Sequence, residues 1–187
     1  MAQAQVTGLR LHFELHGGGT PLCLIEGLGY ATWMWRWQVG PLSARHRVLI
    51  YDNRDVGQSD RVEQPYTVRD MADDLRGLLD YLEIRRAHVL GISLGGYVAQ
   101  EFALAYPDRL WGLILASTAV GGAEMVPIPA ETQRLMVPDP ELPVEQRLRK
   151  AMAVAFAPGY VEAHPDVFES FIRARLASPQ EAAAWGR

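Results

Sequence analysis

AHVLGISLGG, residues 87–96, is the most informative stretch of this sequence. Its first four residues form a short apolar run of the kind that is buried in a parallel sheet. The next five residues fit the pattern G-x-S-x-G, with Ser93 at the centre, and a helical pattern then continues from Leu94 to Tyr106. This order of strand, tight turn and helix predicts a nucleophile elbow, which lifts a serine hydroxyl above the sheet.

Each residue of the elbow has a physical reason. Side chains two positions before and after the nucleophile would collide in so tight a turn, and Gly91 and Gly95 leave the room that it needs. Ser93 is therefore the predicted nucleophile, and the backbone N–H of Leu94, at the start of the helix, is a predicted oxyanion donor. The alternative is a tight strand–helix turn with a serine cap and no chemistry.

The stretch Glu26-Gly27-Leu28-Gly29 offers a second oxyanion donor. It directly follows the apolar run at residues 22–25, and in proteins with such an elbow the second N–H comes from a loop after an earlier strand. The backbone N–H of Leu28 is the predicted donor, with an ordinary glycine turn as the alternative. Trp33 is a candidate for the floor of an acyl pocket, although its i,i+4 spacing to Trp37 on a predicted helix favours packing.

Strand and helix patterns alternate along the first 122 residues. Val6 to Leu15 alternates apolar and polar residues, which predicts an antiparallel hairpin. Thr67 and Asp70 have the spacing of a capping box at the start of an amphipathic helix. Buried strands are predicted at residues 22–25, 48–51, 87–90 and 113–116, and helices at 32–43, 67–82 and 94–106. The alternation predicts an α/β fold, a mostly parallel sheet flanked by helices.

The character of the sequence changes after Gly122. Five prolines lie within residues 127–143, and only helical patterns follow, at residues 144–156, 166–177 and 179–185. We therefore predict two parts, residues 1–122 as the N-terminal part of a sheet core and residues 123–187 as a helical cap or lid. No strand pattern returns to the sheet, so we expect a fold truncated before its last strands, with an exposed sheet edge through which the chain self-associates.

Four segments resemble, in order, motifs of the α/β-hydrolase superfamily. They are Glu26–Gly29, where the family often has His-Gly-x-Gly; Asp52–Ser59, similar to its D-x-R-G-x-G-x-S turn; Gly91–Gly96, similar to its nucleophile elbow; and residues 105–110, similar to its next helix-to-strand passage. The resemblance covers about residues 9–119 and implies the α/β-hydrolase fold. Two positions depart from the family pattern, because Glu26 replaces the common histidine and Asp55 replaces a glycine.

The resemblance also implies an activity. Haloalkane dehalogenases and epoxide hydrolases of this fold have an aspartate at the elbow, so Ser93 favours acyl transfer through a covalent ester. Leu28-Gly29 followed by Met34-Trp35 resembles enol-lactonases and small esterases. The expected function is hydrolysis of a small-molecule carboxylic ester or lactone through a Ser93 acyl-enzyme, which needs no cofactor.

The other two members of a catalytic triad are not evident. In the family an acid and then a histidine follow the serine, but the one histidine after Ser93 is His164, in the predicted cap, and residues 117–121 contain no carboxylate. The earlier histidines fall on the predicted hairpin, a loop, a helix end and a buried strand: His12, His16, His46 and His88. We therefore expect this chain alone to be inactive. The alternative is a non-catalytic protein that binds a small molecule or a partner chain.

Composition argues against several other classes. The net charge is −4 and no dense Lys/Arg block occurs, so nucleic acid is not an expected partner. No apolar run approaches the ~20 residues that span a bilayer, and the first residues do not resemble a signal peptide, so no membrane association is expected. The single cysteine, Cys23, fits a reducing compartment, and we expect the cytoplasm. No histidine and carboxylate spacing indicates a metal site.

Overall fold

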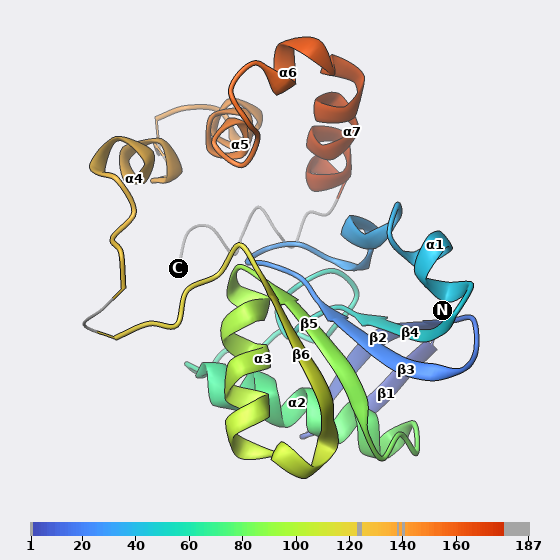
Figure 1. Ribbon diagram of the computed structural model, residues 1–187. Coiled ribbons are helices and arrows are strands. Elements are labelled where there is room, and N and C mark those ends of the chain that lie inside the picture. The colour runs from blue at the N-terminus through green and yellow to red at the C-terminus, as the bar shows by residue number, and fades with distance from the viewer. Residues whose placement is uncertain (1, 123–124, 138, 140, 178–187) are drawn as a thin grey trace. The chain divides into compact units, whose positions relative to one another are not determined.

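A computed structural model describes residues 2–122, 125–137, 139 and 141–177 of the chain (Figure 1). The chain forms two compact units, Met1–Gly122 and Ala123–Arg187. None of the described helices combines the length and the apolar character that a membrane crossing requires. The elbow and the glycine-containing loop predicted from the sequence both lie in the first unit.

The first unit is built on a sheet with six strands in the described part of the chain. The strands are β1 (Ala2–Val6), β2 (Leu9–His16), β3 (Thr20–Ile25), β4 (His46–Tyr51), β5 (Ala87–Ile92) and β6 (Leu110–Ala116). They lie in the order β1-β2-β4-β3-β5-β6. Pairing is antiparallel between β1 and β2 and between β2 and β4, and parallel among β4, β3, β5 and β6. The predicted mostly parallel sheet is confirmed.

Helices cover both faces of this sheet. Helices α2 (Val68–Tyr81) and α3 (Leu94–Ala105) pack against each other and, with alternate residues of the central strands, enclose the larger apolar core. The 3₁₀ helix η1 (Thr32–Trp35) and the short α1 (Val39–Ser43) contribute to a second core on the remaining strand residues. Consecutive residues of β3 therefore enter different cores, which explains why its sequence is continuously apolar.

Strand register brings the two predicted parts of the site together. Ile25, the last residue of β3, pairs with Gly91 of β5, so the residues after β3 lie beside the elbow. Leu24 pairs with Ile50 of β4, so the residues after β3 and β4 also come to the same edge of the sheet. Ligands of open α/β sheets bind at this carboxyl edge of the strands.

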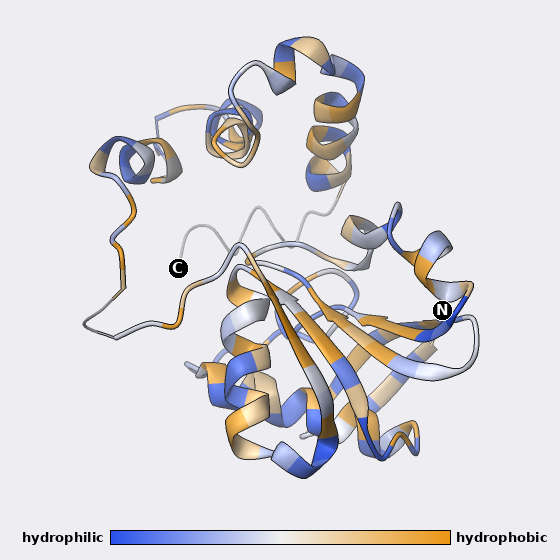
Figure 2. Ribbon diagram, viewed as in Figure 1, coloured by the Kyte–Doolittle hydropathy of each residue, from blue (hydrophilic) through white to orange (hydrophobic). Residues whose placement is uncertain are grey.

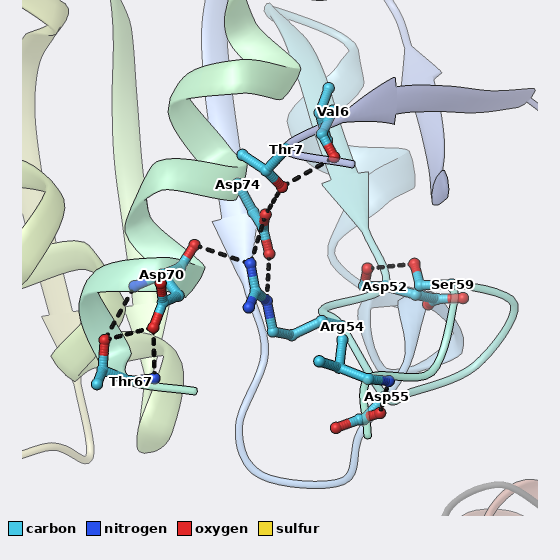
Figure 3. Close-up of polar contacts among 10 residues, drawn as sticks. Val6, Thr7, Asp52, Arg54, Asp55, Ser59, Thr67, Asp70 and Asp74 are labelled. Carbon is cyan, nitrogen blue, oxygen red and sulfur yellow. Dashed lines mark hydrogen bonds and ion pairs between the residues drawn. The ribbon is translucent and has the colours of Figure 1, made fainter. Parts of the chain in front are cut away.

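The capping box predicted for α2 is confirmed (Figure 3). The Asp70 N–H donates to the Thr67 hydroxyl over 3.2 Å, and the Thr67 N–H donates to the Asp70 carboxylate over 2.7 Å. Both hydrogen bonds satisfy backbone donors that have no partner within the helix. The Thr67 hydroxyl also donates to the Asp70 carboxylate, and this bond together with the Thr67 N–H lowers the pKa of Asp70.

A buried ion pair connects the segment after β4 to α2 (Figure 3). Nε of Arg54 lies 2.6 Å from Oδ2 of Asp74, and the side chains are only 9% and 2% exposed. The Thr7 hydroxyl, in the turn between β1 and β2, also hydrogen-bonds to Asp74. Asp55, which replaces the family glycine, has a φ of 69° and accepts a hydrogen bond from the Val62 N–H at 2.7 Å. Aspartate is one of the few residues that tolerate this left-handed conformation.

Three local expectations were wrong. The hairpin consists of β1 and β2 and begins at Ala2, and its β2 strand buries His12 completely, so this part of the hairpin is not wet. The predicted helix at 32–43 is instead two short segments, η1 and α1. His46 begins strand β4 and does not end a helix.

Strand β6 was expected to be buried and is largely exposed. In the part of the chain that the structure describes, it pairs on one side only, with β5. Leu113, Ile114 and Leu115 are 36%, 47% and 41% exposed. Figure 2 shows this strand as largely hydrophobic at the margin of the sheet.

The described part of the second unit is helical. It contains α4 (Ala130–Met136), α5 (Val144–Ala153), α6 (Tyr160–Ala163) and α7 (Pro165–Leu176), with an apolar cluster of Leu148, Met152, Phe168 and Ile172. Helices α5 and α7 were predicted, whereas the short α6 and α4, which lies in the proline-containing segment, were not. The helix predicted at residues 179–185 falls outside the described residues.

Candidate active site

Ser93 lies at the junction of β5 and α3, where the chain turns sharply. Its φ is 53° and its ψ is −120°, a conformation that a residue with a side chain rarely adopts. Its N–H donates to the Ala116 carbonyl over 3.1 Å, and its carbonyl accepts from the Gly96 N–H and the Thr118 hydroxyl, each over 2.9 Å. These contacts hold the strained residue while its side chain stays exposed. Strain of this kind is typical of functional sites.

The two elbow glycines lie where no side chain fits. A methyl group on Gly91 would lie 2.1 Å from the Gly95 carbonyl oxygen. A methyl group on Gly95 would lie 2.3 Å from the Ile25 oxygen and 2.6 Å from the Glu26 oxygen. Gly95 therefore allows α3 to approach the end of β3 directly.

The predicted oxyanion loop, Glu26–Gly29, called the oxyanion loop below, lies against Ser93, the predicted nucleophile. A methyl group on Gly27 would be 3.3 Å from Cβ of Ser93 and 3.7 Å from its Oγ. Leu28, the next residue, is 60% exposed, and Gly29 has a φ of 68°. The Tyr30 N–H closes the turn on the Gly27 carbonyl over 3.2 Å. The structure thus brings the loop that contains Leu28 to Ser93, at the start of α3 where Leu94 lies.

The role of Trp33 as the floor of an acyl pocket stays a prediction, and a second tryptophan, Trp35, hydrogen-bonds to the loop. Trp33 is half-buried and packs against Tyr30, with ring centroids 5.6 Å apart. Trp35 is buried in the second core, and its Nε1 donates to Oε2 of Glu26 over 3.2 Å. The i,i+4 argument for Trp33 and Trp37 assumed an α-helix. Because η1 is a 3₁₀ helix with three residues per turn, its residues lie on different faces from those of an α-helix.

Two buried carboxyl groups, one of them in the first residue of the loop, follow the ends of β3 and β4. Glu26 is 0% exposed and Asp52, directly after β4, is 1% exposed. Burial and the nearby charge of Asp52 hold the pKa of Glu26 well above its ordinary value. Burial also raises the pKa of Asp52, although the N–H groups of Gln58 and Thr32 oppose that shift. Sequence reasoning noted Glu26 as a departure from the family pattern, but its nearness to Asp52 follows only from the parallel pairing of β3 and β4.

No histidine is placed as a general base within the first unit. His16 and His46 lie towards the opposite edge of the sheet, because His46 pairs with the first residue of β3. His88 lies five residues before Ser93 along β5, a rise of roughly 16 Å. His12 is fully buried, and His164 belongs to the second unit. Among the described residues, no cluster of His, Cys, Asp and Glu could hold a metal ion.

Comparison with known proteins decides the family. Residues 20–185 match the family model described as alpha/beta hydrolase fold. The chain belongs to the alpha/beta hydrolase family. Strand order, elbow and glycine loop agree with this assignment, and the superfamily resemblance noted in the sequence is confirmed.

The relatives and solved structures that resemble this chain are named as different hydrolases. The chain is 39% identical over 107 residues to a protein of Azorhizobium caulinodans named as a carbamate hydrolase, RutD, which covers 57% of this chain and 40% of that protein. It is 35% identical over 155 residues to a 2-hydroxy-6-oxononadienedioate/2-hydroxy-6-oxononatrienedioate hydrolase of Paraburkholderia phymatum, with 79% and 54% covered. The enol-lactonase of Burkholderia xenovorans LB400 superposes with a TM-score of 0.76 at 30% identity, over 98% of this chain and 71% of that chain. The match to RutD thus spans about two fifths of the length of that relative.

Proposed function

We propose that the full-length protein hydrolyses carboxylic esters or lactones of small molecules through an acyl-enzyme on Ser93. The observation that carries this proposal is the strained, exposed Ser93 with Gly27 of the oxyanion loop packed against it. A serine hydroxyl in this conformation points out of the sheet, and two backbone N–H groups flank the place where a bound carbonyl oxygen would lie.

The reaction follows from this geometry. Oγ of Ser93 attacks the carbonyl carbon while a base takes its proton, and the N–H groups of Leu28 and Leu94 stabilise the oxyanion that forms. Collapse of this intermediate breaks the ester bond, and the alcohol leaves with the proton from the base. Water then attacks the acyl-serine by the same route, which releases the acid and restores the hydroxyl.

The base and its orienting acid are part of the proposal. A serine is a weak nucleophile unless a histidine, itself oriented by a carboxylate, takes its proton. Because no histidine of the first unit is placed for this role, we propose that both groups come from outside it. The role of the helical second unit as a cap, and the cytoplasmic location, stay predictions from the sequence.

Carbamate hydrolysis is a second candidate. It is favoured by the 39% identity to the RutD protein, which is named as a carbamate hydrolase. The same nucleophile and oxyanion donors serve both reactions, which differ in the group carried by the serine, a carbamoyl group in place of a carbon acyl group. The non-catalytic alternative predicts saturable binding of such compounds without turnover.

A substrate panel on the full-length protein tests these candidates. We would measure kcat/KM for a small aryl ester, a five-membered lactone and a carbamate, for the wild type and for Ser93→Ala. The proposal predicts turnover of an ester or lactone that the substitution reduces by about 10⁶-fold in kcat. Preference for the carbamate would favour the second candidate, and turnover that survives Ser93→Ala would exclude both.

A further inference from the structure

Glu26 and Asp52 occupy equivalent places on neighbouring parallel strands. Leu24 of β3 pairs with Ile50 of β4, and two residues further along each strand Glu26 and Asp52 follow. Both side chains are buried at the carboxyl edge of the sheet, close enough for the charge of Asp52 to act on Glu26. Two buried carboxylates in this position would repel each other, and a proton on one of them removes that repulsion.

The two carboxyl groups accept hydrogen bonds from the two ends of the 3₁₀ helix η1. Oε2 of Glu26 accepts from Nε1 of Trp35 at 3.2 Å, and Oδ1 of Asp52 accepts from the Thr32 N–H at 2.7 Å. Thr32 and Trp35 are the first and last residues of η1, directly beyond the oxyanion loop. The chain from Gly27 to Ala31 therefore has a buried hydrogen-bonded anchor on either side.

Glu26 also connects this anchor to the nucleophile. Its backbone oxygen lies close to Gly95, and the next residue, Gly27, packs on Ser93. A displacement of the Glu26 side chain is thus transmitted to the loop whose N–H groups face the reacting carbonyl.

The proton belongs on Glu26. Among the described residues, its Oε1 has no hydrogen-bond partner, and a buried carboxylate oxygen without a donor is more costly than a neutral carboxyl group. Hydrogen bonds from Trp35 and from the Asn53 N–H oppose the rise of its pKa without offsetting it. Asp52 retains the charge, because Thr32 and Gln58 donate to it over 2.7 Å and 2.8 Å.

The other titratable groups around the pair do not replace this proton. Cys23 of β3 and Tyr51 of β4 are fully buried, and burial raises the pKa of each, so both stay neutral at pH 7. His12 of β2 lies on the Asp52 side of the pair, where its charge would favour the ionised Asp52.

We infer that Glu26 is a positioning residue that holds the oxyanion loop against Ser93 as a neutral carboxylic acid, and that its ionisation beside Asp52 releases the loop. This inference rests on the proposed function for its effect on hydrolysis. As pH rises, Glu26 loses its proton, two negative charges face each other, and the loop loses its anchor. Because the loop acts on the transition state, the loss is expected in kcat more than in KM.

The test compares Glu26→Gln, Glu26→Ala and the exposed control Glu63→Gln with the wild type, all in the full-length protein. Glutamine keeps the shape and the neutral state at every pH, whereas alanine removes the anchor. We expect kcat of the wild type and of Glu63→Gln to fall at alkaline pH by up to about 10²-fold. Glu26→Gln should lack this alkaline limb, and Glu26→Ala should be impaired at every pH. An alkaline limb that persists in Glu26→Gln would overturn the inference.

Two measurements decide the inference without turnover. Infrared difference spectra should show a protonated carboxyl band at pH 7 in the wild type that Glu26→Gln lacks. Amide hydrogen exchange of residues 26–35, corrected for the intrinsic effect of pH, should accelerate at alkaline pH in the wild type and not in Glu26→Gln. If no substrate is hydrolysed, the proposed function fails, and these results still confirm or refute the role of Glu26. Absence of the band, or equal exchange in both proteins, refutes it.

Discussion

At the scale of single residues, the elbow depends on close backbone contacts. Ser93 adopts a strained φ of 53°, and the glycines around it have no room for a methyl group. Such strain persists only where the surrounding structure fixes it. Substitutions that leave the chemistry of Ser93 intact but change these contacts therefore test whether the geometry matters.

Gly95→Ala tests the approach of α3 to β3. The added methyl group would lie 2.3 Å from the Ile25 carbonyl oxygen, so either the helix or the loop must move. We expect a loss of about 1–3 kcal/mol in the free energy of unfolding and a marked loss of hydrolysis. Gly40→Ala in α1 is the control, because its methyl group meets nothing within 4 Å. Equal effects of the two substitutions on stability would contradict this account of the elbow.

Glu26→Gln should also change how stability depends on pH. Because the folded state raises the pKa of Glu26 above its ordinary value of 4.5, it binds this proton more tightly than the unfolded chain does. The wild type is therefore stabilised by Glu26 at low pH, and this contribution declines as pH rises from about 4.5 towards the folded-state pKa. The slope reaches about 1.4 kcal/mol per pH unit. Denaturant unfolding at several pH values should show Glu26→Gln gaining on the wild type as pH rises, and parallel curves would contradict this.

At the scale of elements, a capping box and a buried ion pair stabilise the position of α2. Its capping box satisfies the N-terminal backbone donors, and its buried Asp74 connects it to Arg54 after β4 and to Thr7 in the first turn. The capping box was predictable because it depends on two residues three positions apart. The ion pair was not, because Arg54 and Asp74 meet only after β4 and α2 have packed.

Asp74→Asn tests the buried ion pair. The substitution leaves the Arg54 guanidinium buried without a counter-charge, which should lower the free energy of unfolding by about 3–5 kcal/mol. Asp60→Asn is the matched control, since its partner Arg10 is mostly exposed and the loss should be much smaller. Urea unfolding of both variants gives the comparison, and similar losses would show that burial of the pair is unimportant.

At the scale of the whole molecule, sequence patterns predicted what depends on local periodicity. The predicted strands, α2, α3 and the strand–turn–helix around Ser93 all appear, although β6 is not buried, because each has its own apolar pattern and its own end signals. Glu26 and Asp52 come close together because β3 and β4 pair in parallel, and no local sequence pattern contains this register. The hydrogen bond of Trp35 to Glu26 was not predictable either, because the i,i+4 pattern indicated an α-helix where the chain forms a 3₁₀ helix.

The exposed β6 gives a prediction about association. Among the described strands β6 pairs only with β5, so its other backbone groups and its apolar side chains form an edge that another chain can extend. We expect the 187-residue chain to self-associate, and Ile114→Lys to reduce the apparent mass in light scattering. Leu104→Lys on α3, at a side chain that is 80% exposed, is the control and should leave association unchanged. Association that is insensitive to Ile114→Lys would place the contact elsewhere.

Covalent trapping tests the central claim most directly. The full-length protein would be treated with a phosphonate ester that reacts only with activated serines, digested, and analysed by mass spectrometry. The account predicts one adduct on the peptide that contains Ser93, its absence in Ser93→Ala, and protection by a hydrolysed ester. A modified serine elsewhere, or no adduct in a protein that hydrolyses esters, would contradict the assignment of Ser93 as the nucleophile.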